Sequence, residues 1–277
     1  MNGSAVNDSN EGSKPGADTT RQPPVVNIIT FSDVADSVAA AARDFRAAPL
    51  YGLFFGGIYT VGGWLIAYFL IAFDLPFLAY PTATGFALIA PFVAAGTYEV
   101  SRRLEADEPL SWRGVLGSVW HRGGKDLGWM ALVTVFAFYI WIDLAGIIYL
   151  IFFGLNWPDW ATFLPTVFGT PHGLAFLIVG NLAGAVIAVI VFSITAVSFP
   201  ILLDRDIDFV TAMITSVKAV TRNPKPMIAW CFIIAIVLAG SLATLLSGMI
   251  VLLPLIGHAT WHLYRRVVAP EAVTPIP

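Results

Sequence analysis

Two histidines near the C-terminal end are the first candidates for chemistry in this sequence. His258 and His262 lie four residues apart, so on a helix both side chains project from one face. Such a pair can bind a metal ion or haem, because histidine is the most common metal ligand in proteins. A metal site needs further ligands, however, and polar aromatic side chains beside Trp261, Arg265 and Arg266 also anchor helices at a membrane surface. We assign no metal and keep the pair as candidate polar residues.

A repeated pattern connects a third ionisable group with these histidines. The segments PFVAAGTYEVSRR, from Pro91, and PLIGHATWHLYRR, from Pro254, carry Pro, Thr, an aromatic residue and Arg-Arg at identical offsets. Superposing the two segments places Glu99 at the position of His262, so we expect the two side chains at equal depth, able to share a hydrogen bond or an ion pair. Buried ionisable groups are costly unless paired and often mark proton or ion pathways. The alternative is a structural lock between two helix ends.

Asp143 is the only acidic residue well inside an apolar run, WIDLAGIIYL. Counted from Leu127 at about 1.5 Å per residue, it lies in the outer half of a membrane span. Asn181, seven residues into the next apolar segment, reaches a similar depth, and its amide would satisfy a buried carboxyl group. The pair is a candidate substrate or proton site, or else a structural hydrogen bond between helices. If Asp143 instead lies at the level of the outer lipid headgroups, an acidic residue there needs no functional explanation.

The elements that position these residues are long apolar segments. The chain has 277 residues, of which 57% are hydrophobic and 12% charged, and its mean hydropathy is +0.78. A hydrocarbon core about 30 Å thick needs roughly 20 apolar residues in a helix. Six candidate spans cover residues 50–73, 77–98, 127–152, 174–203, 227–246 and 249–264. We expect the last two to be short helices around Ser247 and Gly248, because one continuous helix would be about 57 Å long.

The basic residues predict the orientation of these six spans. All 15 Lys and Arg residues fall in the N-terminal tail, the second loop, the fourth loop or the C-terminal tail. Basic loops stay in the cytoplasm, so both termini are expected there. Residues 1–27 are predicted to be a disordered cytoplasmic tail, 28–268 the membrane domain and 269–277 a short cytoplasmic tail.

The third loop, residues 154–173, differs from the others because it is aromatic and lacks basic residues. It contains Trp157, Trp160, Phe163 and Phe168. Aromatic rings favour the membrane–water interface, so we expect a short helix on the outer leaflet. A lid over a cavity is the alternative, because pockets commonly lie between helices.

Each hairpin of two spans follows an amphipathic segment, which suggests a three-fold internal repeat. These segments cover residues 31–47, 110–122 and 207–222. In the first and third, an Asp lies 16 residues before a Pro, and an acid near the start of a helix suits its dipole. Ser111 is the expected N-cap of the second. Two small-residue pairs, Gly52 with Gly56 and Gly180 with Gly184, are predicted to allow close helix packing.

Three motifs together resemble an uncharacterised family of integral membrane proteins of proteobacteria, a domain of unknown function. They are YEVSRRLEADEP, SFPILLDRDIDFVTAMITSVKAVTRNP and LPLIGHATWHLYRRVV, and the likeness extends from about Phe31 to Val268. The resemblance implies a fold and a bacterial inner membrane, not an activity. Some members carry the label cytochrome c oxidase subunit I. Such a subunit needs more spans and more histidine ligands than the four histidines here, so we do not extend that label to this chain.

The sequence as a whole predicts an all-α polytopic membrane protein of three hairpins. It contains no phosphate-binding, dinucleotide-binding or metalloprotease motif, and we expect neither enzymatic activity nor a cofactor. The leading hypothesis is a structural or accessory subunit that packs with other membrane proteins or with its own copies in the lipid bilayer, without nucleic acid. The alternatives are a small transporter or channel that uses Asp143 and Asn181, and a haem-binding redox protein.

Overall fold

The chain is helical throughout the part that the structure describes. The computed structural model describes residues 24–86, 88, 90–155 and 160–270, and no strand occurs among them. The helices are α1 (Phe31–Ala47), α2 (Pro49–Ala72), α3 (Pro76–Phe86), α4 (Ala90–Glu105), α5 (Trp112–Phe153), α6 (Trp160–Gly169), α7 (Pro171–Thr195), α8 (Ser198–Asp204), α9 (Phe209–Arg222), α10 (Pro224–Ala243) and α11 (Met249–Val267). Residues 1–23, which belong to the tail predicted to be disordered, lie outside the described residues, and so do residues 271–277 of the predicted C-terminal tail.

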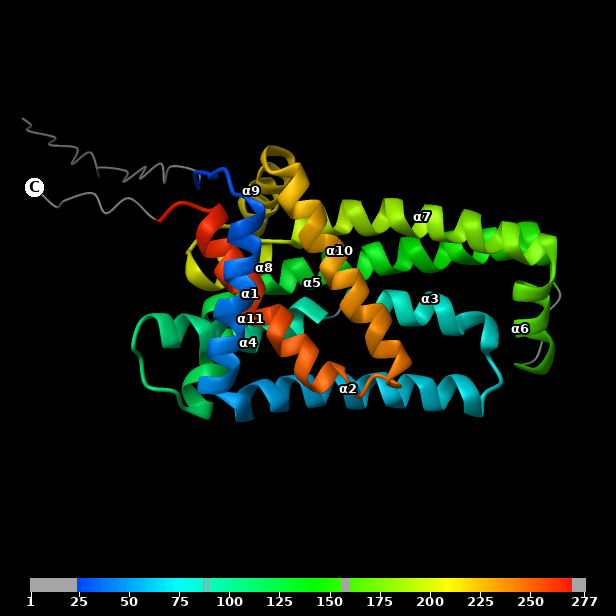
Figure 1. Cartoon of the computed structure of the whole chain (residues 1–277), viewed down its shortest axis with the longest axis horizontal. Coiled ribbons are helices and arrows are strands. Elements are labelled where there is room, and N and C mark those ends of the chain that lie inside the picture. Colours follow the sequence, from blue (N-terminus) through cyan, green and yellow to red (C-terminus); the bar gives the residue numbers. More distant parts are fainter. Residues whose placement is uncertain (1–23, 87, 89, 156–159, 271–277) are drawn as a thin grey trace, which may run out of the picture.

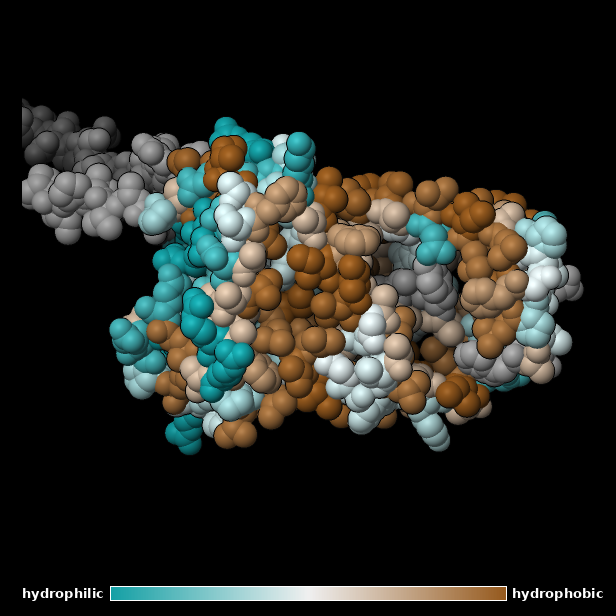
Figure 2. All heavy atoms as spheres, in the orientation of Figure 1, coloured by the Kyte–Doolittle hydropathy of each residue, from teal (hydrophilic) through white to brown (hydrophobic). Residues whose placement is uncertain are grey.

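The long helices run side by side along the longest axis of the molecule. Figure 1 shows α2, α5 and α7 in this direction, with α10 and α11 inclined across them. The helices α1 and α9 lie at one end, which we call the charged end, and α6 lies across the other, which we call the aromatic end. The described chain begins and finishes at the charged end. Hydrophilic residues gather over α1 at this end, whereas hydrophobic residues cover much of the middle (Figure 2).

The packed core lies toward the charged end. Its largest fully buried side chains include Trp230, Trp261, Tyr264 and Phe199. Toward the aromatic end the apolar helices expose most of their surface, and in the most apolar part of α5 only 17% of the residues are buried inside the molecule. Exposed apolar helix surface of this extent is stable in lipid and not in water.

Among the residues that the structure describes, four helical segments are long and apolar enough to cross a membrane: Pro49–Ala72, Gly124–Phe153, Pro171–Asp204 and Pro224–Ala243. Two of the six predicted spans are not among these four. The predicted span 77–98 is divided between α3 and α4. The predicted span 249–264 is α11, whose second half combines two histidines with a Trp and a Tyr and is largely buried against other helices. The structure therefore supports four spans, and the six-span arrangement stays a prediction.

The helix ends follow local rules that the sequence carries. The Ser111 side chain accepts a hydrogen bond from the backbone N–H of Gly114 (3.1 Å), which confirms it as the N-cap of α5. Asp208 caps α9 in the same way through Thr211. Within α5, Gly124 has φ +30° and ψ −120°, a conformation that disfavours a side chain. The kink at this glycine separates the amphipathic start of α5 from its apolar part.

The turn between α10 and α11 confirms two separate helices in place of one. Residues Leu245 and Leu246 both have positive φ, 50° and 66°, which is uncommon for residues with a side chain. Two side chains of α2 hold this turn, because the Trp64 indole N–H donates to the Leu245 carbonyl (2.6 Å) and Thr60 donates to the Leu246 carbonyl (3.3 Å). The neighbouring α2 thus stabilises a conformation that local sequence disfavours.

The segment just before α1 corrects the predicted extent of the N-terminal tail. Val26 and Ile29 are buried, and Val26 forms an antiparallel bridge with Val268. Asn223, between α9 and α10, accepts a hydrogen bond from the Ile29 backbone N–H (2.8 Å) and donates to the Asn27 carbonyl (2.9 Å). Residues 24–27 are therefore ordered, because buried apolar side chains and backbone hydrogen bonds offset the entropy lost on ordering them.

Replacing Asn223 by alanine is expected to release this segment. The substitution leaves the Ile29 N–H and the Asn27 carbonyl without their partner, which costs about 1–3 kcal/mol for a buried group. Hydrogen–deuterium exchange should show faster exchange at residues 27–29. Thr221→Ala is the matched control, because Thr221 is exposed and bonds only to carbonyls of its own helix. Equal exchange in the two variants would contradict the assignment.

Candidate functional site

The charged end brings four polar side chains from three helices into one group, which we call the histidine–aspartate cluster. It consists of Asp44 from α1, Ser101 from α4, and His258 and His262 from α11. The Asp44 carboxylate accepts hydrogen bonds from the Ser101 hydroxyl (2.6 Å) and from Nε2 of His262 (2.7 Å). Nδ1 of His258 lies 2.7 Å from the Ser101 oxygen. The cluster thereby connects α1 with α4 and α11.

The hydrogen-bond pattern assigns the proton of His258. Because the Ser101 hydroxyl already donates to Asp44, its oxygen accepts from Nδ1 of His258. The other ring nitrogen, Nε2, is buried and has no hydrogen-bond partner among the described residues. Neither cavity that we describe below is lined by His258. Ser101 donates to the aspartate and not to a histidine, so the group does not form the activated nucleophile of a hydrolase.

Asp44 is ionised at neutral pH and is the acceptor of the cluster. Burial alone would raise the pKa of this carboxyl group, but hydrogen bonds from His262 and Ser101, with the charges of both histidines, hold it below its ordinary value. An acid in the last turn of a helix is unfavourable for the helix dipole. Asp44 lies there in α1, so its contacts with α4 and α11 are the compensating interaction.

Glu99 belongs to a second group, an ionic network on α4. Its side chain is 0% exposed and forms ion pairs with Arg102 (2.8 Å) and Arg103 (2.7 Å). Arg102 also pairs with Glu108 (2.7 Å). Burial alone would raise the pKa of Glu99, but hydrogen bonds and charge from Arg102, with hydrogen bonds from Ser118 and Arg103, lower it. The carboxylate is thus held charged inside the protein.

The predicted pairing of Glu99 with His262 is therefore wrong. Glu99 pairs with Arg102 and Arg103, and His262 pairs with Asp44. Within the described parts of the chain, no hydrogen bond or ion pair joins Glu99 to His262. The physical reason is that both arginines lie one turn after Glu99 on the same helix, whereas α1 inserts Asp44 beside His262. Sequence reasoning missed Asp44, although its unfavourable place near a helix end was an available signal.

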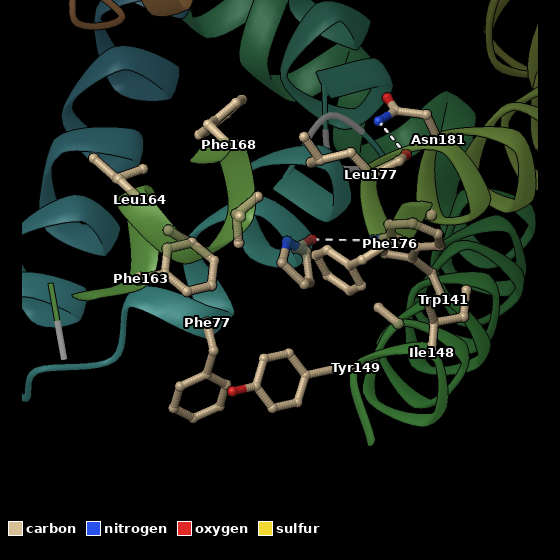
Figure 3. A pocket seen from close by; sticks show the side chains of 15 residues that line it. Phe77, Trp141, Ile148, Tyr149, Phe163, Leu164, Phe168, Phe176, Leu177 and Asn181 are labelled. Carbon is tan, nitrogen blue, oxygen red and sulfur yellow. Dashed lines mark hydrogen bonds between the residues drawn. The ribbon is translucent and has the colours of Figure 1, made fainter. Parts of the chain in front are cut away.

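The structure does not join Asp143 to Asn181. Asn181 lines a cavity of about 230 Å³ between α3, α5, α6 and α7, and its amide donates to the Leu177 carbonyl (2.8 Å). Figure 3 shows Phe163, Leu164 and Phe168 of α6 on one side of this cavity. In the part of the chain that the structure describes, Asp143 does not line the cavity, and its side chain is exposed. The expected shared site of the two residues is not formed.

The two glycine pairs have different surroundings. Gly52 and Gly56 are buried, and a Cβ placed on Gly56 would overlap the backbone carbonyl of Ile250 in α11. A Cβ on Gly184 would lie 3.1 Å from the ring of Trp141, but a Cβ on Gly180 would meet no heavy atom within 4 Å. Gly180 is therefore not needed for close packing within this chain, in contrast to the prediction, because it borders the cavity and not a helix.

Comparisons with known proteins assign a broad class to the chain and no activity. No curated protein and no solved structure matches it. Residues 79–204, which include α4, α5, α6 and α7, match the model of a family described as predicted integral membrane protein (DUF2189). Together with the four apolar helices, this match identifies an integral membrane protein that contains an uncharacterised membrane domain.

Proposed function

We propose that the protein is a structural or accessory membrane subunit that associates with another membrane protein through the exposed face of α5. The observation that carries this proposal is the position of Asp143. The residue lies within the candidate span Gly124–Phe153 and is exposed on the surface of the chain. A carboxyl group that faces lipid is costly, and such residues normally face protein or a water-filled cavity.

The residues around Asp143 form one continuous face. Phe136, Tyr139, Ile147 and Leu150 are exposed large hydrophobic residues and lie three or four positions apart from one another or from Asp143. This spacing places them on a single side of the helix. A partner helix packed along this face would cover the carboxyl group and replace lipid around it.

The charge of the chain favours a different protein as the partner. Its 15 basic residues fall outside the middle of the apolar segments, so a second copy has no cation at the depth of Asp143. Two copies packed through this face would bring two carboxyl groups together. A partner with an amide, a hydroxyl or a basic side chain at that depth would satisfy Asp143 directly.

The transporter alternative has less support. A path through the membrane that used both Asp143 and Asn181 would need one cavity to reach both residues, and the cavity between α3, α5, α6 and α7 reaches only Asn181. For the orientation, we propose that the charged end faces the cytoplasm of a bacterial cell, as the distribution of basic residues supports. The three successive sets of amphipathic and apolar helices support the proposed internal repeat.

Photo-crosslinking in intact membranes tests the proposed interface. A crosslinker at Ile147 should capture a partner protein, and the Asp143→Leu variant should reduce the yield about ten-fold, since an interhelical hydrogen bond in a membrane contributes about 1–2 kcal/mol. Ser193→Ala is the control, because Ser193 is a polar residue of a different apolar helix, α7, and its hydroxyl donates to a backbone carbonyl of that helix. A crosslinker at Leu65, exposed on α2, should capture nothing comparable. Equal yields from Asp143→Leu and Ser193→Ala would contradict the proposal.

A further inference from the structure

A second cavity lies between α4, α7, α10 and α11, and we call it the lateral cleft. Its volume is about 230 Å³ and its walls are mostly apolar. It is too small for another helix, whose diameter is about 10–12 Å, and cavities with apolar walls do not hold water well. Its dimensions suit a hydrocarbon chain.

A buried hydrogen-bond donor without a partner distinguishes this cleft from a simple packing defect. Tyr98 is 4% exposed and Trp230 is 1% exposed, and both line the cleft. Among residues 24–86, 88, 90–155 and 160–270, the indole N–H of Trp230 is buried without an acceptor. Buried polar groups nearly always have partners. The unsatisfied indole N–H therefore indicates a ligand that supplies an oxygen acceptor, and the Tyr98 hydroxyl belongs to the lining of the same cleft as a second possible donor.

The depth of the cleft matches one leaflet of a bilayer. Tyr98 directly precedes the buried ionic residues of α4, so it lies where the apolar bundle meets the charged end. Along α11 the cleft is lined from Thr260 to Met249, which is about 16 Å at 1.5 Å per residue. Half of a hydrocarbon core is about 15 Å thick. Lipid ester groups lie at the boundary between this core and the headgroups, and a chain that fills the cleft would place its ester group at the level of Tyr98.

We infer that the lateral cleft binds one glycerolipid from the leaflet at the charged end, with an ester carbonyl accepting hydrogen bonds from Tyr98 and Trp230. One acyl chain then runs along the cleft from Thr260 toward Met249. The apolar walls exclude water and provide dispersion contacts, while the two donors set the depth of the lipid. This binding site is separate from the α5 face and does not depend on a protein partner.

Native mass spectrometry of the full chain, purified from membranes in mild detergent, tests the inference. The wild type should retain one glycerolipid per chain. Ala235→Trp places a large side chain in the cleft and should abolish retention. Ile236→Trp is the matched control, because Ile236 is the next residue of α10, is exposed and does not line the cleft. Tyr98→Phe and Trp230→Phe each remove one donor and should lower retention about five-fold, the effect of one hydrogen bond.

Three results would overturn the inference. They are a wild type without bound lipid, equal retention in Ala235→Trp and Ile236→Trp, and retention of an isoprenoid molecule in place of a glycerolipid. If Ala235→Trp fails to fold, the two Phe variants decide, because neither adds volume and Tyr98→Phe removes only a hydroxyl group. Unchanged retention in both would then exclude the proposed hydrogen bonds. None of these measurements is affected by the outcome of crosslinking at the α5 face.

Discussion

Replacing Glu99 by alanine is expected to lower the free energy of unfolding by about 3–5 kcal/mol, because the change breaks a buried ion-pair network. Glu99 is fully buried and accepts hydrogen bonds from both Arg102 and Arg103. Without the carboxylate, two partly buried guanidinium groups lose their shared buried acceptor. Glu108 remains as a partner of Arg102 at 2.7 Å and of Arg103 at 3.6 Å, but its side chain is partly exposed. The measurement is reversible unfolding in mixed micelles, compared with the wild type.

Glu108→Ala is the control for this prediction. Glu108 also pairs with Arg102, but its side chain is 37% exposed, and exposed ion pairs contribute about 0–1 kcal/mol. Each variant therefore removes one carboxylate that pairs with Arg102. The two carboxylates differ in burial, because Glu99 is buried and Glu108 is partly exposed. If they destabilise the protein equally, burial of Glu99 does not contribute as we describe.

The pH dependence of Glu99 has a defined sign. Its pKa in the folded protein is below the ordinary value of 4.5, so its contribution to stability is present above pH 4.5 and is lost as the pH falls through the folded-state pKa. Glu99→Gln lacks this titration. The difference in stability between the wild type and Glu99→Gln should accordingly shrink as the pH is lowered below 4.5.

Gly56→Ala is expected to cost about 1–3 kcal/mol, the range for overpacking a close contact. The added methyl group would overlap the backbone carbonyl of Ile250, and backbone cannot move aside as a flexible side chain can. The helices α2 and α11 must therefore separate, which also weakens the support that α2 provides to the turn before α11. Thermal unfolding in detergent measures the loss.

Gly57→Ala is a nearly ideal control for the same helix. A Cβ on Gly57 meets no heavy atom within 4 Å, and alanine is favoured over glycine inside a helix by about 1 kcal/mol. This variant should be as stable as the wild type or more stable. A similar loss in both variants would show that the close approach of α2 and α11 does not limit stability.

Much of the local structure was determined by the sequence alone. The all-helical class, the amphipathic helix at residues 31–47, the Ser111 cap and the separate helices around Ser247 and Gly248 were all predicted and are observed. Each depends on interactions within a few residues: apolar periodicity, a side chain that caps the next turn, or a length limit. Such features need no knowledge of the neighbours in space.

The partners of the polar residues were decided only by the tertiary structure. Comparison of the two matched segments related Glu99 to His262, but it could not show that α1 brings Asp44 between α4 and α11. In the same way, the rotation of α5 about its axis turns Asp143 to the surface and away from the cavity that Asn181 borders. Depth in a membrane follows from counting residues along one helix. Which side chains meet depends on how several helices rotate and pack, and that is a property of the whole fold.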